Sequence, residues 1–342
     1  GAVMTSLTAA PRAHERALSP WRRFLSRHIA LVPVFAAAAI LLVMIAGAMI
    51  NFPNFQLPRI LSSILLDNAY LLVLAVGMTF VILTGGIDLS VGAVMAFTGI
   101  LCARLLSEGV PVAVAIPAMI AIGGAIGLLI GVLVQFFDVQ PFIASLIGMF
   151  LARGLAFVVS LESIKVADEG LLWLQSTRLS FGGWYITPTG ILALLTVVLA
   201  ALVLRYTRFG RTVYAIGGSE QSARLMGLPV VRTRLLVYVI SGICAGIAGI
   251  VLTAYSGAGY PLNGVGTELD TIAAVVIGGT LLTGGSGFVV GSLIGVFVYG
   301  LIRTIISFLG AEQSWTRITV GALLLVFVVV QRVIVSRSAT RR

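Results

Sequence analysis

Long uninterrupted apolar runs constrain this chain more than any other feature of its sequence. They recur along almost its whole length and are separated by short segments that carry Gly, Pro or charged residues. A helix that crosses the hydrocarbon core of a bilayer needs about 20 such residues. The runs therefore predict an all-α polytopic membrane protein with about ten transmembrane helices, at roughly residues 29–50, 60–84, 88–106, 111–135, 141–160, 190–206, 234–256, 267–283, 288–308 and 316–335.

The composition excludes most other classes of protein. Of the 342 residues, 59% are hydrophobic and 10% are charged, whereas soluble domains carry about 25% charged residues. A soluble enzyme and a disordered tail are both excluded. The two cysteines, Cys102 and Cys244, lie inside apolar runs and behave as small core residues, so we expect neither a disulfide nor a metal site.

Arginine placement predicts how the chain is oriented in the membrane. Cytoplasmic loops of membrane proteins carry an excess of Lys and Arg. Arginines gather here near both termini and between the runs at 190–206 and 234–256. We therefore expect both termini in the cytoplasm, an arrangement that requires an even number of spans. The net charge of +10 then reflects this orientation and not binding to nucleic acid.

This orientation divides the chain into three parts. Residues 1–28 form an Arg-rich cytoplasmic segment, 29–335 a transmembrane domain, and 336–342 a basic cytoplasmic tail. Within the domain, 161–189 is expected to be the longest outer loop and 207–234 the main cytoplasmic loop. The sequence LTGG at 83–86 also recurs at 282–285. This spacing fits an internal repeat, a common feature of transporters, although a chain with 39 glycines also produces such matches by chance.

The chain lacks the sequence that a conventional ATPase requires. A P-loop needs a lysine that reaches the β- and γ-phosphates. The single lysine, Lys165, lies outside any such motif. If the protein is a transporter, its energy must come from an ion gradient or from a second subunit.

A few ionisable residues fall within or beside the apolar runs, where each is a functional candidate because burial of charge in a membrane is costly. They are Asp67, Asp88, Arg153, Glu268, Asp270 and Arg303. The acids lie near the expected helix ends, where a carboxylate can cap free N–H groups. For Asp88, Glu268 and Asp270, capping and substrate contact both remain open. A gradient-driven carrier would instead need such acids in the middle of a span.

The cytoplasmic loop 207–234 contains the pattern of a short helix. Ser219, followed by Glu220 and Ser222, indicates a helix start, and Gly227 followed by Pro229 indicates its end. A helix of about two turns on the inner face could dock a soluble subunit. It could also be a surface loop whose arginines follow the orientation rule.

Three long motifs resemble those of ribose-type sugar permeases of ATP-binding-cassette (ABC) importers. They are this loop, GGIDLSVG at 85–92 and ELDTIAAVVIGGT at 268–280. The resemblance runs in order from about residue 58 to 335. Three shorter segments, LDNAY at 66–70, SLESI at 160–164 and AGYPL at 258–262, are similar to permeases of galactofuranose importers within this family.

The resemblance implies a transport subunit of the bacterial inner membrane, not an enzyme, that imports a monosaccharide, with galactofuranose expected. It implies a second related permease, ATP-binding subunits and a periplasmic sugar-binding protein as partners, with ATP and Mg²⁺ bound by the partner ATPase and no cofactor bound by this chain. The expected ATPase contact comprises Glu220, Ser222, Ala223, Arg224, Leu225, Met226 and Gly227. The expected substrate path comprises Asn68, Asp88, Ser90, Tyr255, Tyr260, Asn263, Glu268 and Asp270. The alternative function is a gradient-driven secondary sugar carrier.

Overall fold

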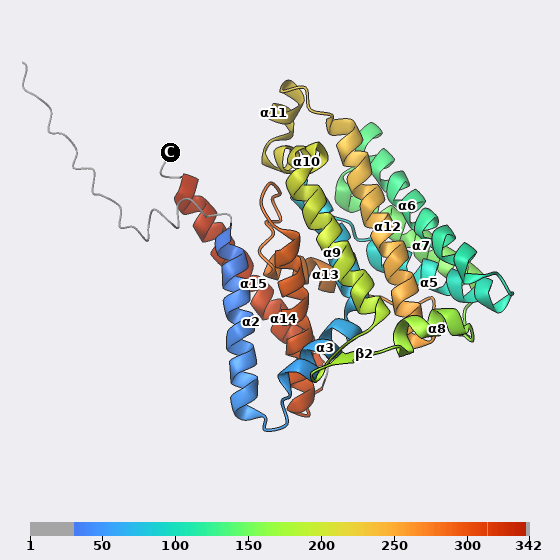
Figure 1. Cartoon of the computed structure of the whole chain (residues 1–342). Coiled ribbons are helices and arrows are strands. Elements are labelled where there is room, and N and C mark those ends of the chain that lie inside the picture. Colours follow the sequence, from blue (N-terminus) through green and yellow to red (C-terminus); the bar gives the residue numbers. More distant parts are fainter. Residues whose placement is uncertain (1–30, 313, 340–342) are drawn as a thin grey trace, which may run out of the picture.

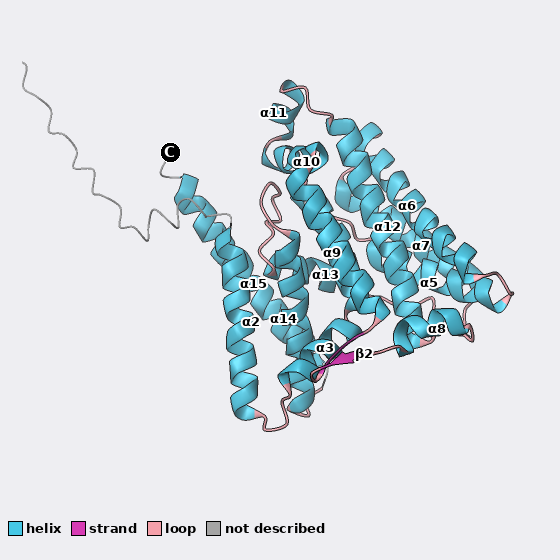
Figure 2. Cartoon of the chain, in the orientation of Figure 1, coloured by secondary structure: helices cyan, strands magenta, loops and turns pink. Residues whose placement is uncertain are grey.

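The computed structural model describes residues 31–312 and 314–339, and the predicted cytoplasmic segment 1–28 lies outside this part of the chain. Helices make up most of the described residues (Figure 2). In chain order they are α2 (Val32–Asn51), α3 (Leu57–Asp67), α4 (Ala69–Leu83), α5 (Val91–Ser107), α6 (Val112–Phe136), α7 (Pro141–Val159), α8 (Glu169–Ser176), α9 (Pro188–Tyr206), α10 (Arg208–Gly218), α11 (Glu220–Leu225), α12 (Val230–Ser256), α13 (Thr267–Ile277), α14 (Val289–Phe308) and α15 (Ser314–Ala339).

Four short strands form two small antiparallel sheets. They are β1 (Ile164–Lys165), β2 (Leu179–Phe181), β3 (Trp184–Ile186) and β4 (Ala258–Gly259). β1 pairs with β4, with Ile164 opposite Gly259, while β2 and β3 form a hairpin with Phe181 opposite Trp184. The predicted outer loop 161–189 therefore folds as β1, α8 and this hairpin.

Seven described helices are long and apolar enough to cross a membrane, or eight if the bent pair α3–α4 counts as one span. The all-α polytopic fold is therefore confirmed, but the predicted number of ten spans is higher than this. Two predicted spans are shorter than expected: the helix in 88–106 begins only at Val91, and the helix in 267–283 ends at Ile277. The second helix ends because Gly279 adopts a positive φ of 97°, which a helix cannot continue.

The centre of the bundle is α4, in which every residue except Tyr70 is buried. It packs against α9, α12, α13 and α14, and α12 in turn packs against α5 and α6. α12 and α6 approach closely because glycines face each other at their crossing. A Cβ atom on Gly246 would lie 2.7 Å from the carbonyl oxygen of Met119. Small residues permit such close backbone contact between membrane helices.

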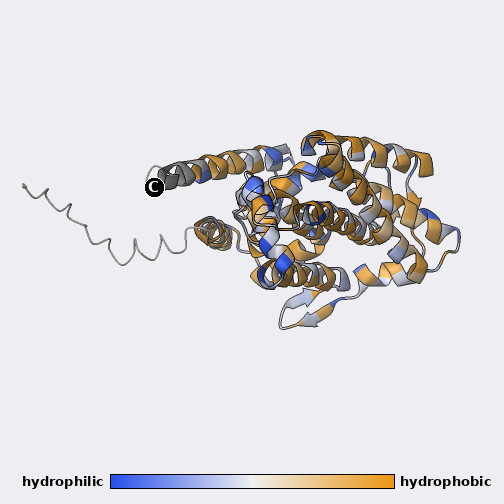
Figure 3. Cartoon of the chain, turned by 90° about the horizontal axis from the view of Figure 1, so that it is seen from above, coloured by the Kyte–Doolittle hydropathy of each residue, from blue (hydrophilic) through white to orange (hydrophobic). Residues whose placement is uncertain are grey.

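The outer helices expose apolar side chains over long stretches. Leu42 on α2, Phe150 on α7, Leu195 on α9 and Leu325 on α15 are each at least half exposed. Figure 3 shows that apolar residues predominate along most of the helices. A soluble protein rarely exposes so large a continuous apolar surface, so these helices face lipid.

The two ends of the bundle carry different elements (Figure 1). α11 lies at one end, and the start of α2 and the end of α15 point toward that same end. α8 and the β2–β3 hairpin lie at the opposite end. This agrees with the predicted placement of both termini on the side of the 207–234 loop. Which end faces the cytoplasm stays a prediction, and so does the cytoplasmic tail 336–342, of which 336–339 continue α15.

The first glycine of each LTGG segment adopts a positive φ, whereas of the second glycines only Gly285 does so. Gly85 follows α4 with a φ of 79°, and Gly284 follows α13 with a φ of 84°. Each turn leads into a long buried helix, α5 in the first case and α14 in the second. The two copies share this geometry at their first glycine only, and the internal repeat stays a prediction.

Candidate functional site

A break between two helices contributes to a cavity lined by polar side chains. α3 ends at Asp67 and α4 begins at Ala69, and the two helix axes differ by 64°. Asn68 lies at the break, where its backbone N–H and its side-chain amide both donate to the carbonyl oxygen of Ile64, at 3.0 and 2.9 Å. The side-chain oxygen of Asn68 is buried and accepts no hydrogen bond from the described residues. Buried polar atoms are nearly always paired, so this oxygen is available to a ligand or to water.

The last turns of α12 and of α14 close this cavity. It has a volume of about 420 Å³, within the range of roughly 300–1,000 Å³ that small-molecule sites occupy. Its lining residues come from four helices: Ile60, Ser63, Ile64, Asp67, Asn68, Tyr70, Leu252, Tyr255, Gly300, Arg303, Thr304, Ser307 and Phe308. Since α12 runs from α11 to this cavity, the two lie roughly 40 Å apart at 1.5 Å per helical residue.

The cavity combines the polar groups that can recognise a polyhydroxylated molecule. The Asp67 carboxylate accepts hydrogen bonds, the Arg303 guanidinium donates them, and the Asn68 amide does both. The Tyr255 hydroxyl donates to Oδ1 of Asp67 at 3.1 Å. Arg303 forms no ion pair with any described residue, so its guanidinium is not bonded to a carboxylate in this part of the chain.

Of the predicted substrate-path residues, Asn68 and Tyr255 line this cavity. Asp88 and Ser90 lie elsewhere, in the turn before α5, where both are buried. Oδ1 of Asp88 accepts from the backbone N–H and the hydroxyl of Ser90, at 2.9 and 2.6 Å, and Oδ2 accepts from the Ser241 hydroxyl of α12 at 2.6 Å. Asp88 therefore fixes the start of α5 to α12 through protein groups alone.

Of the other four predicted residues, Tyr260 and Asn263 lie between α12 and α13, and Glu268 and Asp270 lie in the first turn of α13. The side chain of Tyr260 is exposed. The backbone carbonyl of Asn263 accepts from Arg153 of α7 at 2.8 Å, and Arg153 also donates to the Pro261 carbonyl at 2.6 Å. Oε1 of Glu268 accepts from the Gly266 N–H at 3.3 Å. This bond at the first turn of α13 resembles the capping role considered for Glu268.

Asp270, in the same first turn, is paired differently. Its Oδ2 accepts from the hydroxyl of Tyr299 on α14 at 3.0 Å. The bond joins the start of α13 to α14. None of the residues from Tyr260 to Asp270 lines the cavity at the α3–α4 break.

Several cavity residues were not assigned to the substrate path from the sequence. Asp67 and Arg303 were identified only as ionisable residues in or beside apolar runs, and Ser63, Thr304 and Ser307 were not singled out. An available signal was that Asp67 and Arg303 are two of the few charged residues within or beside the apolar runs. That α3, α12 and α14 meet here depends on packing that spacing along the sequence does not reveal.

The predicted cytoplasmic helix is present as α11. The hydroxyl of Ser219 accepts from the Ser222 N–H at 3.2 Å and caps its start. It ends before Gly227, whose φ is 72°. The helix comprises six residues, slightly less than the two turns expected. Ala223 is fully buried against Ile216 and Val230, so one face of α11 is fixed to the bundle.

Two large apolar side chains at the end of α11 are exposed, beside the exposed polar residues of the helix. Leu225 is 83% exposed and Met226 is 66% exposed. These side chains lie on a short helix at one end of the molecule and not on a lipid-facing span (Figure 1). An exposed apolar pair on a fixed support is suited to contact with another protein.

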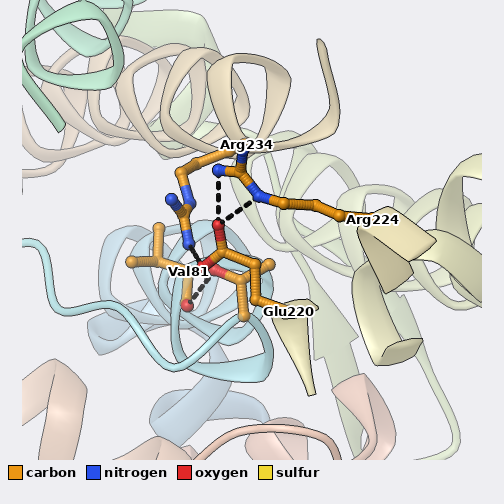
Figure 4. Close-up of polar contacts among 5 residues, drawn as sticks. Val81, Glu220, Arg224 and Arg234 are labelled. Carbon is orange, nitrogen blue, oxygen red and sulfur yellow. Dashed lines mark hydrogen bonds and ion pairs between the residues drawn. The ribbon is translucent and has the colours of Figure 1, made fainter. Parts of the chain in front are cut away.

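An ion pair between Glu220 and Arg234 joins α11 to the start of α12, and Arg224 of α11 contacts the same carboxylate (Figure 4). Oε1 of Glu220 accepts from Nη2 of Arg224 at 2.7 Å and from its Nε at 3.1 Å, and Oε2 pairs with Nη2 of Arg234. Burial alone would raise the pKa of Glu220, but the hydrogen bonds and positive charges of Arg224 and Arg234 outweigh this effect and lower it. Glu220 therefore remains ionised at neutral pH.

Comparison with known proteins identifies the family. A family model described as the permease component of branched-chain amino acid transport systems matches residues 60–328. The fructose import permease FruG of Bifidobacterium longum is 43% identical over 90% of this chain and 92% of its own length. The inner membrane ABC transporter permease YjfF of Escherichia coli is 46% identical over 82% of this chain and 86% of its own length.

The ribose import permease RbsC of Escherichia coli is 39% identical over 85% of this chain and 91% of its own length. No solved structure gives a match. These relatives are permease subunits of transporters, not enzymes, and YjfF is an inner membrane protein; proteins of this kind work with ATP-binding and substrate-binding partners. They favour an ABC importer over the alternative of a gradient-driven carrier. This chain therefore belongs to the branched-chain amino acid transport permease family. It is a sugar ABC permease, a multi-pass protein of the inner membrane.

Proposed function

We propose that this chain forms part of the membrane path of a monosaccharide importer, and that the path includes the cavity at the α3–α4 break. The observation that carries the proposal is the set of polar groups in that cavity, namely Asp67, Asn68, Tyr255 and Arg303. A carboxylate, an amide and a guanidinium in one cavity match the donors and acceptors of a sugar. Sparse contacts of this kind suit a path from which the substrate must also be released.

ATP hydrolysis is assigned to a partner chain, with ATP and Mg²⁺ bound there. α11 is the proposed contact with that ATPase, because Leu225 and Met226 are exposed while Ala223 anchors the helix. The contact would comprise the predicted residues from Glu220 to Gly227. Movement of the ATPase would displace α11 and thereby open the bundle toward either side in turn.

Galactofuranose is the first substrate to test, and it rests on the similarity of residues 66–70, 160–164 and 258–262 to permeases of galactofuranose importers. Fructose is the second, because FruG of Bifidobacterium longum is a fructose import permease and is similar over 90% of this chain. We further propose that the membrane core contains a second, related permease.

Purification of the full chain from its own membranes in mild detergent tests this proposal. We expect an ATP-binding subunit and a second permease to copurify, and the sugar-binding protein of the same system to bind galactofuranose in a calorimetric titration. Preferential binding of fructose would replace the substrate and leave the importer function intact. Recovery of the chain with no ATP-binding subunit under any mild detergent would contradict the importer function. Recovery of the ATPase with this permease alone would contradict the heterodimer.

A further inference from the structure

The two LTGG turns, far apart in sequence, meet at one point in the bundle. The backbone N–H of Gly285 donates to the carbonyl oxygen of Leu83 at 2.9 Å. A Cβ atom on Gly284 would lie 2.8 Å from the backbone nitrogen of Gly85. This contact is therefore made by backbone atoms of both turns, with no side chain between them.

The end of α10 inserts into the same point. A Cβ atom on Gly217 would overlap the carbonyl oxygen of Leu83 and the backbone nitrogen of Gly285. A Cβ atom on Gly285 would in turn lie 2.9 Å from the nitrogen of Gly218. The hydroxyl of Tyr214, one turn earlier on α10, donates to the carbonyl oxygen of Gly287 at 2.8 Å. We refer to this contact of Gly85, Gly217 and Gly284–Gly285 as the glycine junction.

The glycine junction lies between α11 and the helices that line the cavity. Gly217 precedes Ser219, the residue that caps α11, by two positions. The first turn ends α4, which begins beside Asn68 about 20 Å away. The second turn leads into α14, which carries Arg303 and Thr304 into the cavity. Two of the helices that form the cavity therefore start or end at the junction.

We propose that Gly217 is a positioning residue that transmits displacement of α11 to the cavity through both LTGG turns. A contact between side chains can absorb a small displacement by changing rotamer. Backbone atoms in direct contact have no such freedom, since packed interiors are hardly compressible. A shift at the end of α10 must therefore move the end of α4 and the start of α14. This inference rests on the proposed contact between α11 and an ATPase.

The experiment compares Gly217→Ala with Gly218→Ala in the full complex. Gly218 is the matched control because a Cβ atom there meets nothing within 4 Å. The measured quantity is the number of sugar molecules taken up per ATP hydrolysed by the reconstituted complex. A purely structural role would lower the yield of complex without changing this ratio. We expect Gly217→Ala to lower the ratio at least tenfold, and Gly218→Ala to leave it within twofold of the unchanged protein.

A second variant keeps the test decisive where Gly217→Ala does not assemble. Tyr214→Phe removes the bond to Gly287 and adds no atom, and we expect it to lower the ratio two- to fivefold. An unchanged ratio in an assembled Gly217→Ala complex would overturn the role of Gly217, and so would equal losses in both glycine variants. If Gly217→Ala does not assemble, an unchanged ratio in Tyr214→Phe would overturn it. If the unchanged protein takes up sugar without ATP, the proposed function itself is wrong, and this inference with it.

Discussion

Replacement of Glu220 by Gln tests which charge holds α11 in place. The carboxylate pairs with two arginines, but their surroundings differ. The side chain of Arg224 is 51% exposed, whereas that of Arg234 is 18% exposed. Since exposed ion pairs contribute little, the two partners should differ in energy although both contact the same carboxylate.

The structure gives the magnitudes. Glu220 and Arg224 form a pair four residues apart on one short helix, and such a pair contributes about 0.3–0.5 kcal/mol. Loss of Glu220 leaves Arg234 partly buried with no acidic partner among the described residues. A partly buried charged group without a partner costs about 1–3 kcal/mol. We expect Glu220→Gln to destabilise the permease by about 2 kcal/mol, most of it through Arg234.

A double-mutant cycle measures the two pairs separately. The variants are Glu220→Gln, Arg224→Gln, Arg234→Gln and the two double substitutions with Glu220→Gln. The free energy of unfolding is measured for each in mixed micelles with increasing denaturing detergent. We expect an interaction energy of about 1–2 kcal/mol for Glu220 with Arg234, and below about 0.5 kcal/mol for Glu220 with Arg224. Equal interaction energies, or a larger one for Arg224, would refute the reasoning from burial.

Four further predictions follow from the structure. The pKa of Glu220 is lowered in the folded chain, so the ionised carboxylate stabilises the fold above its ordinary pKa of about 4.3, and this contribution is lost as the pH falls through the lower folded value. Between about pH 6 and pH 3 the free energy of unfolding should therefore fall more for the unchanged protein than for Glu220→Gln. Identical pH profiles would contradict this. Arg303→Gln should lower sugar uptake about 10–100-fold, because hydrogen bonds to charged groups contribute about 1.5–3 kcal/mol. Arg59→Gln, at an exposed position, should leave uptake unchanged. Equal effects of the two substitutions would show that the cavity has no special role. Gly246→Val should destabilise the bundle by about 1–3 kcal/mol because a side chain there meets the Met119 carbonyl. Gly154→Val should cost less than about 1 kcal/mol, because a Cβ atom there has no neighbour within 4 Å. Thermal unfolding in detergent measures both effects. Arg153→Gln should weaken the bonds to Pro261 and Asn263 and speed hydrogen exchange of residues 258–266 at least tenfold, and unchanged exchange there would show that Arg153 does not hold this loop.

The main elements of the fold could be predicted from the sequence because a membrane helix is long and must be apolar throughout. The runs at 111–135 and 190–206, for example, correspond closely to α6 and α9. The run at 267–283 does not, since hydropathy alone cannot show that the chain turns at Gly279. Similarly, the run at 60–84 is apolar enough overall to form one span, so hydropathy alone does not place the sharp bend at Asn68.

The candidate sites could be predicted only where the signal is local. α11 was located correctly because Ser219 and Gly227 are adjacent to the helix that they bound. Only Asn68 and Tyr255 of the cavity could be predicted, because the cavity forms where α12 and α14 meet the α3–α4 break, which is distant from both in sequence. Asp88 has the residue type of a substrate ligand, yet the structure pairs it fully with Ser90 and Ser241. Pairing of this kind depends on tertiary packing and has no counterpart in residue spacing.

Uptake of labelled sugar into proteoliposomes tests the central claim most directly. The vesicles contain this permease with the ATP-binding subunit and second permease that copurify with it, the binding protein is added outside, and ATP is enclosed inside. We predict uptake that requires both enclosed ATP and the binding protein, and that continues when a protonophore dissipates the proton gradient. Uptake that ignores ATP and stops with the protonophore would contradict the assignment of this chain to an ATP-driven importer.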